Sequence, residues 1–133
     1  MATAPASAAP SQEVMLVYRE GPGGRLPEQI QFSGVYTLFA PHDFVIPPNG
    51  VTLIYLQIRV RIPPFYQGHF SSLREQVRDG VHVGADYIEP TTTSELKVLL
   101  YNRSWNYYMG QAGDPVARLI LRRTVFPPGR GGD

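Results

Sequence analysis

Cysteine is absent from the chain and lysine is nearly so. Without cysteine, a disulfide framework, a thiolate metal site and a cysteine nucleophile are all excluded. Lys97 is the single lysine, and the formal net charge is only +1. A chain with no polybasic run and no strong net charge is a poor candidate for binding nucleic acid or a membrane surface by bulk charge.

Long hydrophobic runs are also missing. No apolar stretch approaches the roughly 20 residues that a membrane span needs. Residues 1–10 are small and rich in alanine and proline, without the charged start and apolar middle of a signal peptide. We therefore expect no transmembrane segment and an intracellular location.

Recognisable catalytic and metal-binding motifs are the third absence. His42, His69 and His82 are not spaced as a metal pair on one element. There is no metalloprotease helix motif, nucleophile elbow or phosphate-binding loop. The sequence therefore predicts no bound metal and no cofactor.

The 133 residues are enough for one ordinary hydrophobic core. We expect a disordered lead over residues 1–12, a domain over residues 13–126, and a flexible tail over residues 127–133. Thirteen glycines and thirteen prolines divide the chain into pieces too short for ordinary helices. This punctuation favours β structure.

The clearest hydrophobic pattern lies in residues 52–62, where the even-numbered positions from 54 to 62 are apolar and alternate with polar or aromatic ones. A two-residue period predicts one strand with one buried face, so Arg59 and Arg61 should point outward. Shorter β-prone runs cover residues 14–18, 35–39, 96–101, 117–123 and 124–126. Many short strands indicate an all-β sandwich or barrel.

One short helix is expected at residues 72–79. Ser72 is suited to cap it, Leu73 and Val77 are spaced to share its buried face, and Gly80 is suited to end it. A cluster formed by Trp105, Tyr107 and Tyr108 has two open interpretations. It is either an exposed anchor for a partner or part of the core.

Five runs occur in the order and spacing of the framework segments of trimeric dUTPases: residues 44–48, Gly68, 81–85, 98–102 and 113–120. In these runs the chain resembles that family over about residues 33–126. The resemblance implies a dUTPase-like jelly-roll or β-clip barrel. It also implies a homotrimer as a candidate assembly, since the family's sites lie between subunits.

The same resemblance implies that the positions of the enzyme's chemistry have changed. Thr37 stands where the family has an aspartate that serves the metal, and Glu75 stands near the expected phosphate grip. Glu89 aligns with the catalytic aspartate, and Thr92 with the tyrosine on which deoxyribose stacks. Residues 129–132 have the glycines of the family's closing arm but no aromatic residue. The run 113–120 resembles the family's fourth motif, and in it Pro115 stands where the family usually has a basic residue.

The chain is also similar to the adenovirus early-region-four, open-reading-frame-one family. The similarity lies in residues 32–36, 44–48, 59–64, 96–102 and 125–127. It implies a non-enzymatic early protein that binds host signalling proteins and promotes growth and metabolic signalling of the phosphoinositide 3-kinase type. The alternative is a diverged but active dUTP diphosphatase with Glu89 as general base.

Three expectations about partners and place follow from this resemblance. The charged residues Arg74, Glu75, Arg78 and Asp79 are the candidate partner-binding surface, with an ordinary solvated loop as the alternative. PDZ domains are not expected as partners because they bury a hydrophobic terminal side chain, whereas the last residue here is Asp133. The expected location is the host cytoplasm, with recruitment to a membrane or to the nucleus left open.

Overall fold

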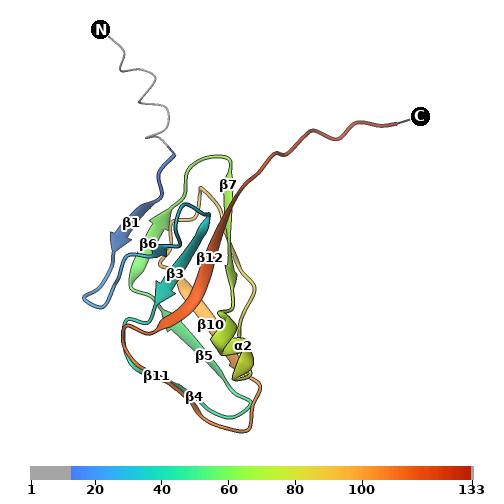
Figure 1. The fold of residues 1–133 in the computed structure, drawn as a ribbon. Helices are drawn as coiled ribbons and strands as arrows, with labels where there is room; N and C mark the ends of the chain where they lie inside the picture. Colours follow the sequence, from blue (N-terminus) through green and yellow to red (C-terminus); the bar gives the residue numbers. More distant parts are fainter. Residues whose placement is uncertain (1–12, 133) are drawn as a thin grey trace.

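The computed structural model describes residues 13–132, which form a β domain with one short helix (Figure 1). The lead predicted over residues 1–12 and the terminal Asp133 lie outside the described residues. The elements are β1 (Leu16–Arg19), β2 (Glu28–Gln29), β3 (Val35–Phe39), β4 (Phe44–Ile46), β5 (Val51–Tyr55), β6 (Ile58–Arg61), β7 (Tyr66–Ser71), α2 (Arg74–Arg78), β8 (Val81–Val83), β9 (Tyr87–Ile88), β10 (Lys97–Asn102), β11 (Tyr108–Gly110) and β12 (Pro115–Arg123).

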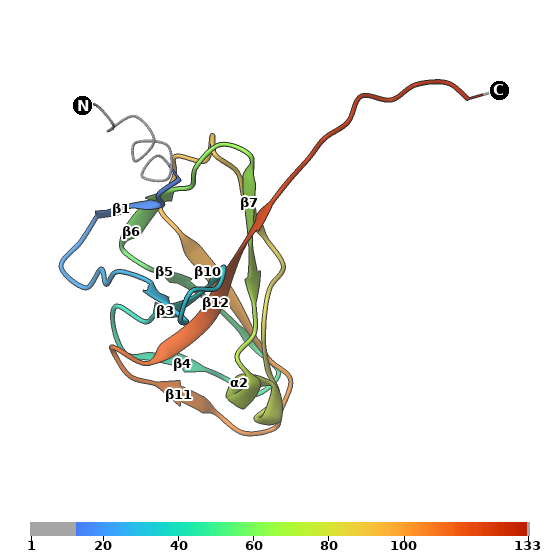
Figure 2. The same ribbon diagram turned by 45° about the horizontal axis from the view of Figure 1, so that its top comes forward.

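The strands form four sheets that pack around one core. The largest has the order β2-β3-β12-β7-β9, so the long strand β12 lies between β3 and β7, as Figure 1 shows. A second sheet has the order β5-β10-β8, and two pairs, β1-β6 and β11-β4, complete the set. Figure 2 shows the β11-β4 pair at the same end of the molecule as α2. The all-β class with one short helix is confirmed, but within residues 13–132 no sheet closes into a barrel.

The predicted alternation over residues 52–62 is confirmed in its burial and wrong in its continuity. Ile54, Leu56, Ile58, Val60 and Ile62 are each at most 1% exposed. The run nevertheless makes two strands, because Gln57 adopts a positive φ of 60° and turns the chain between them. Its amide N–H donates to the Glu95 carboxylate at 2.9 Å. β5 therefore pairs with β10, and β6 with β1.

The short helix is confirmed, but two details of its prediction are wrong. Leu73, not Ser72, is the N-cap residue, because the Ser72 hydroxyl accepts a hydrogen bond from the Val83 amide at 2.9 Å instead. Val77 is 48% exposed, and the buried side chain of the helix is Gln76. Gly80, with φ of +82°, follows the last turn as expected.

The last predicted strand does not form. Residues 124–126 lie outside any strand, and Val125 and Phe126 are 82% and 76% exposed. Beyond them, residues 127–132 run away from the domain without secondary structure (Figure 1). No helix within residues 13–132 has the length and apolarity to cross a membrane.

Candidate functional site

A cross-strand row on the five-stranded sheet forms the base of the site. Arg118 of β12 lies opposite Thr37 of β3 on one side and Ser71 of β7 on the other. Directly opposed residues of antiparallel strands point to the same face, and the neighbours Ala117 and Leu119 are fully buried on the core face. The row therefore lies on the outer face, next to the start of α2.

Gln76 holds α2 against this face. Its side-chain amide donates to the Val116 carbonyl of β12 at 2.6 Å, and its side-chain oxygen accepts from the Leu73 amide at 2.8 Å. The side chain is 1% exposed. One glutamine thus caps the helix and connects it to the central strand, which fixes the position of Glu75 beside it.

The helix, the row and β11 enclose a cavity of about 370 Å³. Its lining residues come from four separate parts of the chain: Thr37, Leu73, Glu75, Gln76, Tyr108, Asp114, Pro115 and Arg118. The structure therefore brings together Thr37 and Glu75, which the sequence analysis had associated only through a family resemblance.

Charges of both signs face this cavity. Asp114 is held in a turn, where its Oδ2 accepts from the Gln111 amide at 2.8 Å. Gly113, with φ of +90°, allows that turn. The Nε of Arg118 is buried and has no hydrogen-bond partner, and no ion pair within residues 13–132 includes Arg118. The arginine therefore lies in the cavity wall without being neutralised by Glu75 or Asp114.

The pKa of Tyr108 is affected by its burial and by the charges around it. Burial raises the pKa of its phenol above the ordinary value, and the carboxylates of Asp79, Asp114 and Glu75 raise it further. Negative charges disfavour formation of a phenolate. The carboxylates of Asp79, Asp114 and Glu75 therefore add to the effect of burial in keeping the Tyr108 phenol protonated.

A second hollow, of about 650 Å³, lies on the other side of Tyr108. It is lined by Arg78, Asp79, Gly80, Ser104, Asn106, Tyr107, Tyr108 and Met109. Of the four predicted partner-binding residues, Arg78 and Asp79 line this hollow, Glu75 lines the first, and Arg74 is exposed but lines neither. Tyr108 lines both hollows, so they are neighbours between α2 and β11, and the two together are called the groove below.

Glu89 and Thr92 lie elsewhere. The Glu89 carboxylate accepts from the Gln67 side chain at 2.7 Å, and the Glu89 amide donates to the Thr92 hydroxyl at 2.9 Å. Gln67 is four residues along β7 from Ser71, a separation of about 13 Å in a strand. Within one chain, Glu89 is therefore remote from the cavity that holds Thr37 and Glu75.

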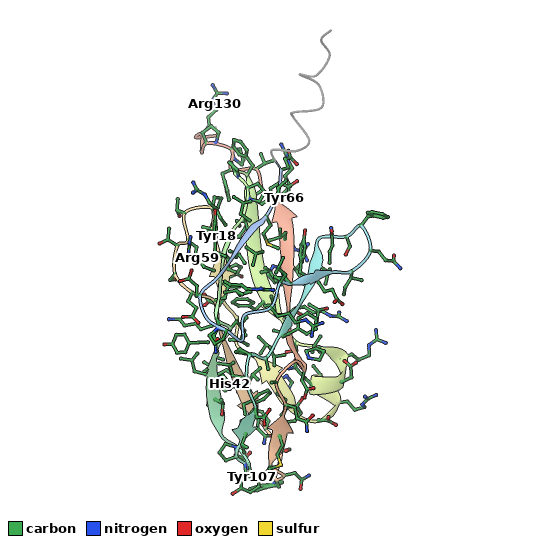
Figure 3. All side chains as sticks on the ribbon, turned by 90° about the vertical axis from the view of Figure 1, so that its left-hand side faces the viewer. Tyr18, His42, Arg59, Tyr66, Tyr107 and Arg130 are labelled. Carbon is green, nitrogen blue, oxygen red and sulfur yellow. The ribbon has the colours of Figure 1, made fainter. Side chains whose placement is uncertain are left out.

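Arg59 of β6 lies outside the groove and has contacts of its own. Arg59 pairs with Glu20 at 3.5 Å and lies 4.3 Å from the centre of the Tyr18 ring (Figure 3). Within residues 13–132, no group of three or more histidine or acidic side chains is arranged to hold a metal ion.

Asp114 and Tyr108 are groove residues that were not predicted as site residues. Asp114 lies in the framework run 113–120, and Tyr108 belongs to the aromatic cluster whose role had been left open. In that cluster Trp105 and Tyr107 are 86% and 67% exposed, and Tyr107 lies at the end of the molecule opposite Arg130 of the tail (Figure 3). The signal for Tyr108 was therefore in the sequence, but its position beside α2 required the fold.

Comparison with known proteins agrees with this architecture. The dUTPase family model matches residues 26–128. The dUTPase of phage phi11 of S. aureus superposes with a TM-score of 0.79 at 17% identity, covering 90% of this chain and 96% of the other. The Staphylococcus bacteriophage 80alpha dUTPase gives a TM-score of 0.79 at 15% identity, with 90% and 96% coverage. The chain belongs to the dUTPase family.

Within that family, the similarity is high to adenovirus early proteins. The Early 4 ORF1 protein of human adenovirus C serotype 2 is 43% identical over 115 residues, which are 86% of this chain and 90% of the relative. The E4-ORF1 of human adenovirus D serotype 9 is 36% identical, with 86% and 92% coverage. The deoxyuridine 5'-triphosphate nucleotidohydrolase of fowlpox virus is 29% identical, with 86% and 81% coverage. These similarities support a viral early protein on a dUTPase-like fold.

Proposed function

We propose that the chain is a non-catalytic viral early protein that binds host signalling proteins in the host cytoplasm. Its binding promotes growth and metabolic signalling of the phosphoinositide 3-kinase type. The similarity to two adenovirus early proteins over most of their lengths supports the viral part of this proposal. The groove between α2 and β11 supports the binding part, because it is concave and bordered by charged and aromatic side chains.

The charge of the cavity is the observation that argues against dUTP hydrolysis. A triphosphate is strongly anionic, so a site for it needs cationic groups or metal ions against the phosphates. In this cavity the carboxylates of Glu75 and Asp114 oppose the single cation Arg118. Thr37 adds a neutral hydroxyl where a carboxylate would be required to hold a metal.

The alternative function is an active dUTP diphosphatase that uses Glu89 as general base. Glu89 is half-buried and oriented by Gln67, which are features of a positioned carboxylate. Calorimetric titration of the intact chain with a non-hydrolysable dUTP analogue and Mg²⁺ distinguishes the two functions. We expect no binding. Micromolar affinity, together with hydrolysis of dUTP by the wild type that is lost in Glu89→Gln, would establish the enzyme and overturn the proposal.

The binding function is tested by capture of phosphoinositide 3-kinase activity from host-cell extract, together with activation of the pathway in transfected cells. We expect reversal of the charges of Arg74 and Glu75 on α2 to reduce both. Deletion of residues 129–133 should change neither. A matched control reverses the charges of Glu20 and Arg59, a pair outside the groove. If the wild-type chain captures no kinase activity and activates no pathway, the proposed function is wrong.

A further inference from the structure

The groove between α2 and β11 has two walls of different chemistry. The α2 wall carries Glu75, Arg78 and Asp79. The β11 wall carries Tyr107, Tyr108 and Met109, of which Met109 is 73% exposed. Two neighbouring hollows with charged side chains on one side and aromatic side chains on the other suit the chemistry of a bound peptide better than that of a flat protein surface.

The carboxylates of the groove form no ion pairs with other side chains in the described part of the chain. Glu75 forms no ion pair within residues 13–132, and neither do Asp79 and Asp114. All three act on the Tyr108 hydroxyl strongly enough to raise the pKa of that phenol, in addition to the effect of burial. A cationic group placed near Tyr108 is therefore attracted by carboxylates that form no ion pair within residues 13–132.

Arg118 supplies a second, independent requirement. Its Nε is buried without an acceptor, although buried polar groups in proteins almost always have one. The carboxylates of Glu75 and Asp114, in the same cavity, are not within ion-pair distance of it. Arg118 lines the cavity and forms no ion pair within residues 13–132, so a ligand that suits the cavity offers an acceptor oxygen to the part of its guanidinium that faces the cavity, as well as a cation to the carboxylates.

A basic peptide has both groups, because its main-chain carbonyls are acceptors and its arginine or lysine side chains are cations. The position of β11 is compatible with such a ligand. This strand pairs with β4 alone within the described residues, so its other edge has no strand partner there and keeps backbone groups with which an extended segment can pair.

We propose that the groove between α2 and β11 binds an extended basic segment of a partner protein, with an arginine or lysine side chain between Glu75 and Asp114. This inference rests on the proposed binding function and names the partner chemistry of that site. Arg118 then donates to a peptide carbonyl, and the rings of Tyr107 and Tyr108 contact the peptide beside the cation.

The test uses the full chain labelled with ¹⁵N and observed by NMR. The probe is a capped peptide of alternating arginine and threonine. The second probe is the same peptide with glutamine in place of each arginine, and the third probe is inorganic phosphate. The arginine peptide should shift the amide resonances of Gln76, Tyr108 and Gly113, whereas the other two probes should not. Loss of two charge-assisted contacts in the double variant Glu75→Gln, Asp114→Asn should weaken binding by about tenfold or more.

The control variant Glu20→Gln removes one negative charge outside the groove and should bind as the wild type does. If Asp114→Asn disturbs its turn, Glu75→Gln alone gives the same test, because Glu75 is exposed and forms no intramolecular ion pair within residues 13–132. Equal binding of the glutamine peptide, shifts of the same resonances by phosphate, or absence of binding would each overturn the proposal. Pathway activation that persists under those outcomes would leave the proposed function standing and reject only the peptide groove.

Discussion

At the scale of single residues, the fold depends on a few buried polar side chains that serve several backbone groups at once. Asn102 is 1% exposed, and its side-chain nitrogen donates to the carbonyls of Ile46, Pro47 and Asn106. Its side-chain oxygen accepts from the amide and the hydroxyl of Ser104. Such a residue connects the end of β4 to the loop that follows β10, and its removal takes a hydrogen bond from each of these groups.

Gln76 has the same role for α2, and it gives the first prediction. Replacing Gln76 with methionine keeps the length of the side chain but removes its bonds to the Leu73 amide and the Val116 carbonyl. We expect the free energy of unfolding to fall by about 1–3 kcal/mol, because two buried backbone groups lose their partners. Urea denaturation followed by circular dichroism measures this loss.

The control for that measurement is Val77→Ala on the same helix. Val77 is 48% exposed, so this change should alter stability by no more than about 0.5 kcal/mol. A Gln76 variant as stable as the control would show that the helix is held by something other than this glutamine.

Tyr108 gives the second prediction, which concerns pH. Its pKa is raised above 10.0, first by burial and then by the carboxylates of Asp79, Asp114 and Glu75. The folded state therefore keeps the phenol protonated at pH values where the unfolded chain loses the proton. The stabilising contribution is complete below the ordinary pKa and is lost as the pH rises through the raised one.

We therefore expect the free energy of unfolding to decline from about pH 10 upward, and to decline less steeply in Tyr108→Phe. Tyr36, whose pKa burial also raises, remains in the variant and accounts for part of the residual slope. Urea denaturation at a series of alkaline pH values measures both slopes. Identical slopes would contradict the assignment of the raised pKa to Tyr108.

At the scale of secondary-structure elements, the first described residues are connected to the central sheet by one carboxylate. Glu13 accepts from the Tyr66 hydroxyl of β7 at 2.8 Å and from the Arg123 guanidinium of β12 at 3.0 Å. The hydrogen bond from Tyr66, and to a smaller extent the one from Arg123, lowers the pKa of Glu13 from its ordinary value of 4.5. The contact joins the residues before β1 to two strands that lie far along the chain.

The third prediction is that Glu13→Gln loosens this attachment. The contribution of the carboxylate is present above its ordinary pKa of 4.5 and is lost as the pH falls through the lowered one. At neutral pH we expect faster amide hydrogen exchange in residues 13–19 of the variant, with little change in β10. When the pH falls below the ordinary pKa of the carboxyl group, hydrogen exchange in residues 13–19 of the wild type should become as fast as in the variant.

Glu28→Gln is the matched control. Glu28 pairs at 3.4 Å with Arg25, three residues away on the same segment, so its loss should not affect residues 13–19. Equal exchange in the wild type and in Glu13→Gln at neutral pH would show that the Glu13 carboxylate does not hold the segment.

Local patterns predicted the elements well, but not their partners. The two-residue period identified the buried face of β5 and β6, because burial depends on the alternation of side chains. It did not show the break at Gln57, where a positive φ is stabilised by the distant Glu95. The strand predicted over residues 124–126 failed for a related reason, since β-propensity does not reveal whether a neighbouring strand is available.

The candidate site could be predicted only in part. The family resemblance selected Thr37 and Glu75, which the structure places in one cavity. Tyr108 and Asp114 join that cavity through the pairing of β11 with β4 and through the turn before β12. Such contacts between distant segments leave no local signal in the sequence.

At the scale of the whole molecule, the outer face of β5 leaves apolar side chains exposed. Val51, Leu53 and Tyr55 are 50%, 45% and 49% exposed. Leu53 lies opposite Leu99 of β10, and Val51 lies opposite Tyr101. Contiguous apolar surface of this kind is typical of a face that is covered by another protein chain.

The last prediction is that copies of this chain assemble as a homotrimer. The resemblance to trimeric dUTPases motivates it. Within one chain Glu89 is remote from the cavity that contains Thr37, which fits a family whose sites lie between subunits. Light scattering at tens of micromolar should give a particle three times the 14.8 kDa of the chain.

Leu53→Glu should shift the mass toward the monomer, because it places a charge on the apolar face. Val77→Glu, at a comparably exposed valine of α2, should leave the mass unchanged. A wild-type monomer at that concentration would rule out the trimer by mass action, and a trimer indifferent to Leu53→Glu would place its interface on another face.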